Sequence, residues 1–248
     1  GGEGYRSNGY NPFGGEIVYA DRWTGAGPAG ENLVGEIFYG LGIQMIDPET
    51  VTVLADGSDG GEAVVRVTGP LVGMPLLDEA AGDLIDPFPF SGEMFIDYSL
   101  GGDDDFLRVT FTARNTTTRI VRIFIPVFGA LMGDGLRLMT PEGGFDDDAY
   151  GGSHPWYGYV GDRVSYAAAD GRGGNLEYFL EESGILVTSL SAPVEIEACG
   201  ETVLPAVDIF VAGGGAEALE AAVRRAKGEP EPAALGGVVR LVDGTPAA

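Results

Sequence analysis

Three residue types that often build reactive sites are nearly missing from this 248-residue sequence, which contains one cysteine, one histidine and one lysine. Because Cys199 has no second cysteine to join, no disulfide can form within the chain. A cysteine nucleophile would also need a nearby base, and His154 is the only histidine. We therefore expect Cys199 to be a small buried apolar side chain, and we assign no catalytic residue.

Positive charge is scarce as well. The sequence has 14 Lys and Arg against 38 Asp and Glu, which gives a net charge of −24 at pH 7. Such a surface repels phosphate groups, so neither nucleic acid nor an anionic membrane is an expected partner. Coding bias, adaptation to salt and calcium binding all remain as explanations of this acidity.

Long apolar runs are also absent. No stretch approaches the roughly 18 consecutive apolar residues of a membrane-spanning helix, so we expect no membrane insertion. The first 23 residues lack the basic start and the apolar middle of a signal peptide. We expect the chain to be a piece of a longer protein.

Glycine is abundant, at 42 residues, and indicates many tight turns and therefore many strands. The clearest strand is FLRVTFTAR (106–114), in which apolar and polar residues alternate strictly. We expect it to form a three-stranded antiparallel meander with residues 93–100 and 119–127. Residues 51–55 and 63–68 flank a Gly/Asp/Ser loop, a pattern typical of a hairpin.

One helix is expected near the C-terminus, in GGAEALEAAVRRAKGEPEP (214–232), and Gly228 with the following prolines ends it. Its apolar positions have helical spacing: Leu219, Ala222, Val223 and Ala226. The preceding glycines are similar to a phosphate-binding loop but bring no basic residue, so we expect a simple helix start. About a dozen strands and one C-terminal helix predict an all-β fold, a large two-sheet antiparallel β-sandwich, or supersandwich.

Several stretches resemble known proteins. DDDFLRVTFTARNTTTRIVRIFIPVFG (103–129) resembles the central strands of galactose-mutarotase-like supersandwiches. YNPFGGEIVYADRW (10–23) and VTVLADGSDGGEAVVRVTG (51–69) are similar to the N-terminal β region of bacterial CehA/McbA-type cell-surface metallohydrolases. GGVVRLVDGTPAA (236–248) is similar to the start of a carboxypeptidase-regulatory-like β-sandwich.

The resemblance implies a domain organisation. Residues 1–228 would be the β-supersandwich domain, residues 229–236 a linker, and residues 237–248 the first strand of a truncated carboxypeptidase-regulatory-like domain. The family carries a metal-binding PHP domain downstream, which uses several histidines. Since this chain has one histidine, we expect that metal site outside it.

The segment GGFDDDAYGGSHPWYGY (143–159) combines aromatic rings with carboxylates, as sugar-binding clefts do. Three readings remain open: glycan binding, mutarotase-like catalysis with His154 as the acid, and aromatic side chains that pack within a loop. The candidate ligand-binding residues are His154, Trp156, Tyr157, Tyr159, Asp146 and Asp148.

Calcium is the one ion for which the sequence contains candidate ligands. Residues 101–106, 55–62 and 145–152 are Asp/Gly loops that could offer oxygen ligands, but none has the EF-hand spacing. Solvated turns are the alternative explanation. We expect no cofactor and assign no metal ligand.

Taken together, the residues and the resemblance imply a non-catalytic accessory β-sandwich domain of an exported, metal-dependent bacterial hydrolase, secreted or held at the cell surface. It would position or contact substrate, with downstream domains of the same chain, and a glycan, as its partners. The alternatives are a mutarotase-like carbohydrate-binding or carbohydrate-active domain, and a structural module of a surface protein.

Overall fold

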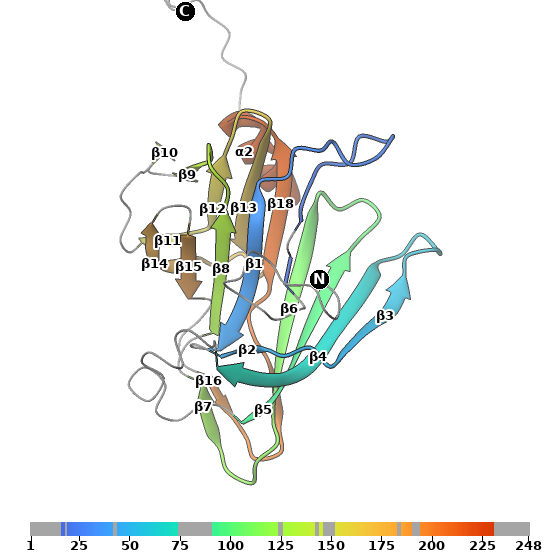
Figure 1. Ribbon diagram of the computed structural model, residues 1–248, viewed down its shortest axis with the longest axis vertical. Coiled ribbons are helices and arrows are strands. Elements are labelled where there is room, and N and C mark those ends of the chain that lie inside the picture. Colours follow the sequence, from blue (N-terminus) through green and yellow to red (C-terminus); the bar gives the residue numbers. More distant parts are fainter. Residues whose placement is uncertain are drawn as a thin grey trace, which may run out of the picture.

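The computed structural model describes residues 16–17, 19–41, 44–73, 91–123, 126–141, 144–145, 152–182, 185–189 and 194–230. Within these residues the fold is built of antiparallel strands and one helix (Figure 1). A path of paired strands bends at β4 and so forms two layers, which confirms the predicted two-sheet β-sandwich. The described helix is too short and polar to cross a membrane.

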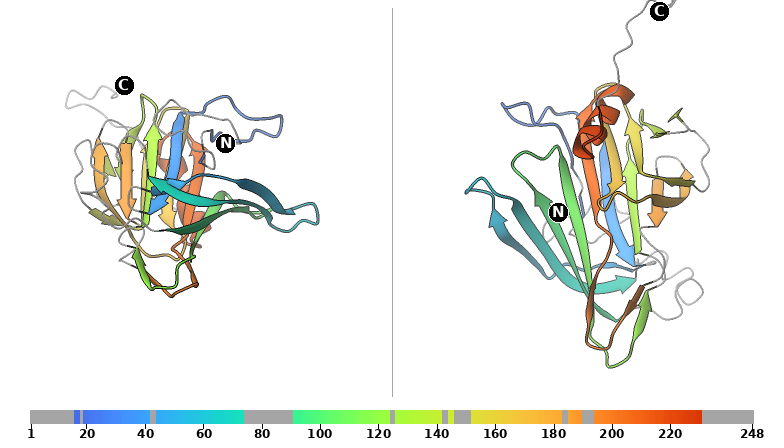
Figure 2. Two further views of the ribbon diagram at one scale, coloured as in Figure 1. Left: turned by 60° about the horizontal axis from the view of Figure 1, so that its bottom comes forward. Right: turned by 180° about the vertical axis from the view of Figure 1, so that it is seen from behind.

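The first layer contains ten strands. In spatial order it begins with β3 (Thr50–Asp56), β4 (Ala63–Gly73), β5 (Gly92–Leu100) and β6 (Phe106–Asn115). Both β17 (Glu201–Val203) and β18 (Val207–Gly213) pair with β6, and after β18 follow β13 (Val164–Asp170), β12 (Trp156–Val160), β9 (Arg137–Thr140) and β10 (Gly144–Phe145). This layer contains the predicted hairpin, as β3 and β4. The β3 end of the layer projects beyond the rest of the molecule (Figure 2).

The second layer contains six strands, which are β2 (Gln44–Ile46), β1 (Val34–Leu41), β8 (Pro126–Met132), β15 (Ile185–Ser189), β14 (Leu176–Glu182) and β11 (Gly152–His154). It joins the first layer where β2 pairs with the C-terminal end of β4. A separate two-stranded ribbon lies at one end of the molecule, formed by β7 (Val121–Ile123) and β16 (Val194–Ile196).

Aromatic side chains connect the two layers in the core. Tyr39 of β1 lies with its ring centroid 4.6 Å from that of Phe111 in β6 and 5.4 Å from that of Phe128 in β8. All three side chains are buried. Along β6, Val109, Phe111 and Ala113 point into the core, as the alternating sequence predicts. Removing this apolar surface from water is the main contribution to the stability of the sandwich.

The predicted three-stranded meander is wrong in its third strand. The described residues of the predicted strand, 119–123 and 126–127, do not return beside β6, whose other neighbours are β18 and β17. Instead the chain forms β7 and then passes into the second layer as β8. The buried side-chain amide of Asn115 fixes this exit, because it donates hydrogen bonds to the carbonyl oxygens of Arg119 (2.6 Å) and Glu197 (3.0 Å).

The helix, α2 (Ala216–Ala226), confirms the sequence prediction. Its buried residues Leu219, Ala222 and Val223 pack with Trp156 and Phe210 on the outer face of the first layer. The approach is close, because a Cβ added at Gly158 in β12 would lie 2.5 Å from a methyl carbon of Leu219. Gly228 follows the helix with a φ of 67°, the left-handed conformation expected of a helix stop.

Cys199 is not the buried residue that its isolation predicts. It is exposed and has a φ of 52°, in a turn in which its backbone N–H donates to the carbonyl of Thr117 at 2.9 Å. The turn geometry, and not apolar burial, determines this position. The end of the predicted linker and the predicted strand 237–248 lie outside the described residues, so that division of the chain stays a prediction.

Candidate functional site

The predicted aromatic site residues sit on β12, where alternate side chains face opposite ways. Trp156 points outward and is covered by α2, with 4% of its surface exposed. Tyr157 and Tyr159 point into the core between the layers. None of the three presents an open ring face to solvent in this arrangement. Their observed role is packing, and a role in ligand binding stays a prediction.

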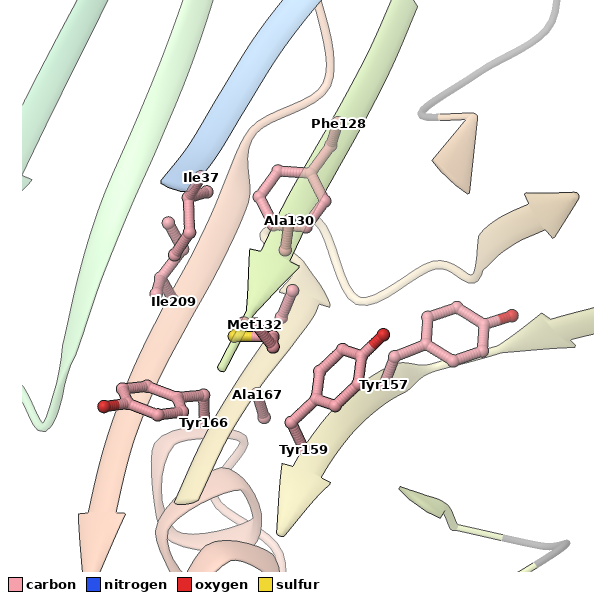
Figure 3. A pocket seen from close by; sticks show the side chains of 10 residues that line it. Ile37, Phe128, Ala130, Met132, Tyr157, Tyr159, Tyr166, Ala167 and Ile209 are labelled. Carbon is pink, nitrogen blue, oxygen red and sulfur yellow. The ribbon is translucent and has the colours of Figure 1, made fainter. Parts of the chain in front are cut away.

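A small cavity lies among the inward-facing side chains, and Tyr157, Tyr159 and Tyr166 line part of it (Figure 3). Its volume is about 20 Å³, enough for one water molecule, and its lining is apolar. The Tyr157 hydroxyl donates a hydrogen bond to the backbone carbonyl of Leu176 at 2.9 Å. This space is a packing gap of the core and is too small for a sugar.

His154 lies on β11 at the edge of the second layer, partly buried. Its ring meets that of Tyr157 edge-on, with centroids 5.5 Å apart and an interplanar angle of 90°. The structure therefore brings His154 and Tyr157 together and places Trp156 on another face. Asp146 and Asp148 lie outside the described residues.

A larger open groove lies at the α2 end of the sandwich. One of the residues that line it is Phe145, which directly precedes Asp146 in the sequence. Its volume is about 690 Å³, within the roughly 300–1,000 Å³ common for small-molecule sites. Three pieces of the chain meet there: the β9–β10 pair, the turn after β12 and the first turn of α2. The residues that line it are Gly135, Arg137, Phe145, Val160, Gly161, Asp162, Gly214, Gly215, Ala216, Glu217 and Ala218.

The groove combines an aromatic face with charges of both signs. The guanidinium of Arg137 lies 4.4 Å from the ring centroid of Phe145, a cation–π contact that holds both side chains at the rim. Phe145 keeps 45% of its surface exposed. Asp162 and Glu217 bring carboxylates from the other two pieces. An exposed ring beside a donor and two acceptors can bind a ligand that has apolar faces and many hydroxyl groups.

Two glycines form the floor of the groove. A Cβ added at Gly214 would lie 2.0 Å from the carbonyl oxygen of Asp162, so only glycine allows the two backbones to approach so closely. Gly215 has a φ of 94°, and its N–H donates to the carbonyl of Gly161 at 2.9 Å. The sequence shows these glycines as a helix start, which is correct. The sequence alone does not predict that these glycines contact Gly161 and Asp162, which lie more than fifty residues earlier in the chain.

Two buried carboxyl groups form a second cluster that sequence reasoning missed. Glu16 and Glu36 are 4% and 0% exposed. Burial, and secondly the charge of Glu36, raises the pKa of Glu16 to about 9, so Glu16 is protonated at neutral pH. Burial and then Glu16 raise the pKa of Tyr98 as well. Their spacing in the sequence gives no sign that they meet.

The Asp/Gly loops that raised calcium make local turn contacts where the structure describes them. The carboxylates of Asp56 and Asp59 accept from the backbone N–H groups of Ser58 (3.0 Å) and Gly61 (2.9 Å), and Asp104 accepts from Gly101 (3.1 Å). Among the described residues, no three His, Cys, Asp or Glu side chains form a group that could hold a metal ion. Calcium binding stays a prediction.

Comparisons with known proteins support the fold. No known family matches the sequence, and no curated protein matches it either. The α-galactosidase of Lactobacillus brevis has a similar structure over 84% of this chain, with a TM-score of 0.51 and 9% identity. The GH36 α-galactosidase AgaA A355E D478A of Geobacillus stearothermophilus, in complex with stachyose, aligns over 77% of this chain with a TM-score of 0.48 and 8% identity.

This chain spans 32% of the Lactobacillus protein and 29% of the Geobacillus protein. The Lactobacillus comparison supports the fold alone: a large antiparallel β-sandwich.

Proposed function

We propose that this chain is a non-catalytic β-sandwich domain of a larger carbohydrate-acting protein, and that it contacts saccharide through the groove between β9, β10 and α2. The observation that supports it is the shared fold, which covers 84% of this chain and about a third of an α-galactosidase. An accessory role fits a domain that is only part of such a chain. Its partners are then a catalytic domain and a glycan.

The composition of the groove supports the saccharide as its ligand. Sugar rings have apolar C–H faces that pack on aromatic rings, and Phe145 offers such a ring at the rim. Hydroxyl groups at the ring edge can accept hydrogen bonds from Arg137 and donate them to Asp162 and Glu217. All four side chains are on backbone that the sandwich and helix hold in place, which limits the entropy lost on binding.

A glycan array followed by isothermal titration calorimetry tests this proposal. We expect binding that Phe145→Ala weakens at least tenfold, whereas Trp23→Ala leaves it unchanged. Trp23 is a matched control, because it is an aromatic residue with 75% exposure and lies outside the groove. Equal losses in both variants, or no glycan bound by the unmodified chain, would reject the groove as a saccharide site.

A finer proposal concerns the parent protein. We infer an exported bacterial hydrolase, secreted or at the cell surface, with a metal-dependent catalytic domain of the PHP type downstream. Its support is the resemblance of residues 10–23, 51–69 and 236–248 to the CehA/McbA-type proteins. Sequencing the gene beyond Ala248 tests it, since an immediate stop codon or an unrelated domain would contradict it. A contradicting result in this test would not affect the separate proposal that the groove binds saccharide.

A further inference from the structure

The edge strand β3 is unusually open for a strand of its composition. All seven of its residues, Thr50–Asp56, are exposed. Val51, Val53 and Leu54 keep 54%, 62% and 51% of their surfaces in contact with solvent. Among the described strands β3 pairs only with β4, so its other edge presents its backbone N–H and carbonyl groups outward.

The exposed valines continue the core-facing side of the first layer. Val51 lies opposite Val67, which lies opposite Ile96, and the last two are 3% and 1% exposed. Directly opposed residues in a sheet share one face, so Val51 belongs to the face that elsewhere forms the core. The same holds for Val53, through Val65 to Tyr98.

This apolar face of the first layer extends beyond the strands of the second layer that cover the rest of it. Figures 1 and 2 show β3 and the adjoining start of β4 projecting away from β1 and β8 of the second layer. Soluble proteins usually protect such an edge with proline, lysine or an inward-pointing charge. Residues 50–55 contain none of these, although a bulge interrupts the ladder between Val53 and Ala55.

We propose that this edge is an interface between two copies of the chain, in which the β3 strands pair antiparallel around a two-fold axis at Thr52. In this register Val51 of each copy lies opposite Val53 of the other, on the core-facing side of both sheets. Thr52 meets Thr52, a favourable cross-strand pair. The regular segment 50–53 before the bulge supplies these contacts, and the interface is isologous, as in most dimers.

Charge favours a second copy at this edge over other positions on the surface. A chain of net charge −24 repels its own copies wherever carboxylates would meet. Residues 50–55 carry no ionisable side chain. Glu49 and Asp56 lie outside the regular segment 50–53, so the residues that pair in the proposed register carry no carboxylate. Across the sheet, Asp97 is already paired with Arg66 at 2.6 Å, on the other face.

The interface predicts an unusual dependence on salt. Remote carboxylates of the two copies repel each other, and added salt screens this repulsion. Association should therefore strengthen between about 50 and about 500 mM sodium chloride, because the screening length falls from about 14 Å to about 4 Å over this range. A basic partner bound to the acidic surface would show the opposite trend.

Sedimentation velocity of the full chain tests the proposal. We expect dimers that increase with protein concentration and with salt, and at least a tenfold weaker association for Val53→Asp. Val203→Asp is the matched control, because Val203 on β17 is 66% exposed against 62% for Val53. A monomer at all concentrations up to 1 mM, or equal weakening by the two substitutions, would overturn the proposal.

A cysteine variant provides a test that does not rely on a destabilising charge. Opposed residues in an antiparallel pair have Cα atoms about 4.5–5.5 Å apart, which suits a disulfide. In a Cys199→Ser background, which removes the exposed native thiol, mild oxidation of Thr52→Cys should give a covalent dimer in high yield. Val203→Cys in the same background should not. Equal crosslinking of both variants would reject the two-fold pairing.

Discussion

Ile17 and Ile37 exchange two backbone hydrogen bonds, with N···O distances of 3.0 and 2.7 Å, and so tie the segment before β1 to β1 itself. This bridge brings Glu16 into the protein interior near Glu36 and Tyr98. A carboxyl group held in this way makes the stability of the fold depend on pH.

The first prediction follows from the raised pKa of Glu16. Folded, Glu16 binds its proton up to a pH of about 9, whereas unfolded it releases it near 4.5. The native state thus holds more protons between these values, so stability falls as pH rises, by up to about 1.4 kcal/mol per pH unit. Glu16→Gln should remove this slope. Urea unfolding at pH 5, 6, 7 and 8 measures it, and an unchanged slope in the variant would contradict the assignment.

The second prediction separates packing from binding at the predicted aromatic residues. Trp156→Ala should lower the free energy of unfolding by about 3–5 kcal/mol, because it opens a cavity beneath α2. Trp23→Ala removes an exposed ring and should stay within about 0.5 kcal/mol of the unmodified chain. Thermal and chemical unfolding give both values. A mild effect of Trp156→Ala would mean that the helix does not cover it.

The third prediction concerns the turn that sends the chain into the second layer. Asn115→Asp replaces the amide donor with an acceptor that faces the carbonyls of Arg119 and Glu197, and should cost about 1–3 kcal/mol. Asn175→Asp is the control, since the Asn175 amide donates to Ser153 at an exposed site. Comparable unfolding midpoints for the two variants would show that the buried contacts of Asn115 are absent.

The fourth prediction concerns the floor of the groove. Gly214→Ala places a methyl group against the backbone of Asp162 and should destabilise the protein by about 1–3 kcal/mol. Gly102→Ala is the control, because a Cβ there has a nearest contact of 3.6 Å. Denaturant unfolding compares them. If Gly214→Ala were as stable as the control, the close approach would be incorrect.

Local patterns carried much of the fold. The alternation along residues 106–114 predicted β6 and its buried face, and helical spacing with Gly228 predicted α2. The prediction of the third strand of the meander was wrong. An alternating strand can pair with any antiparallel neighbour, so its sequence does not determine which strand lies beside it. The decisive contacts of Asn115 reach residues about eighty positions away.

The candidate site was harder to predict for the same reason. Aromatic density around 154–159 suggested a binding surface, but side chains on a strand alternate between faces, and both faces of β12 are covered. The groove depends on Arg137, Phe145, Asp162 and Glu217, which come from separate elements. Only the three-dimensional arrangement brings these side chains together, so no local motif could identify them.

The most direct test of the proposed function is a two-dimensional ¹H–¹⁵N NMR titration of the full chain with the saccharide that the glycan array selects. We predict shifts at the backbone amides of Gly135, Phe145, Asp162 and Glu217, and little change around Trp156 and His154. Shifts confined to residues 154–159, or no shifts at saturating saccharide, would contradict the groove as the binding surface.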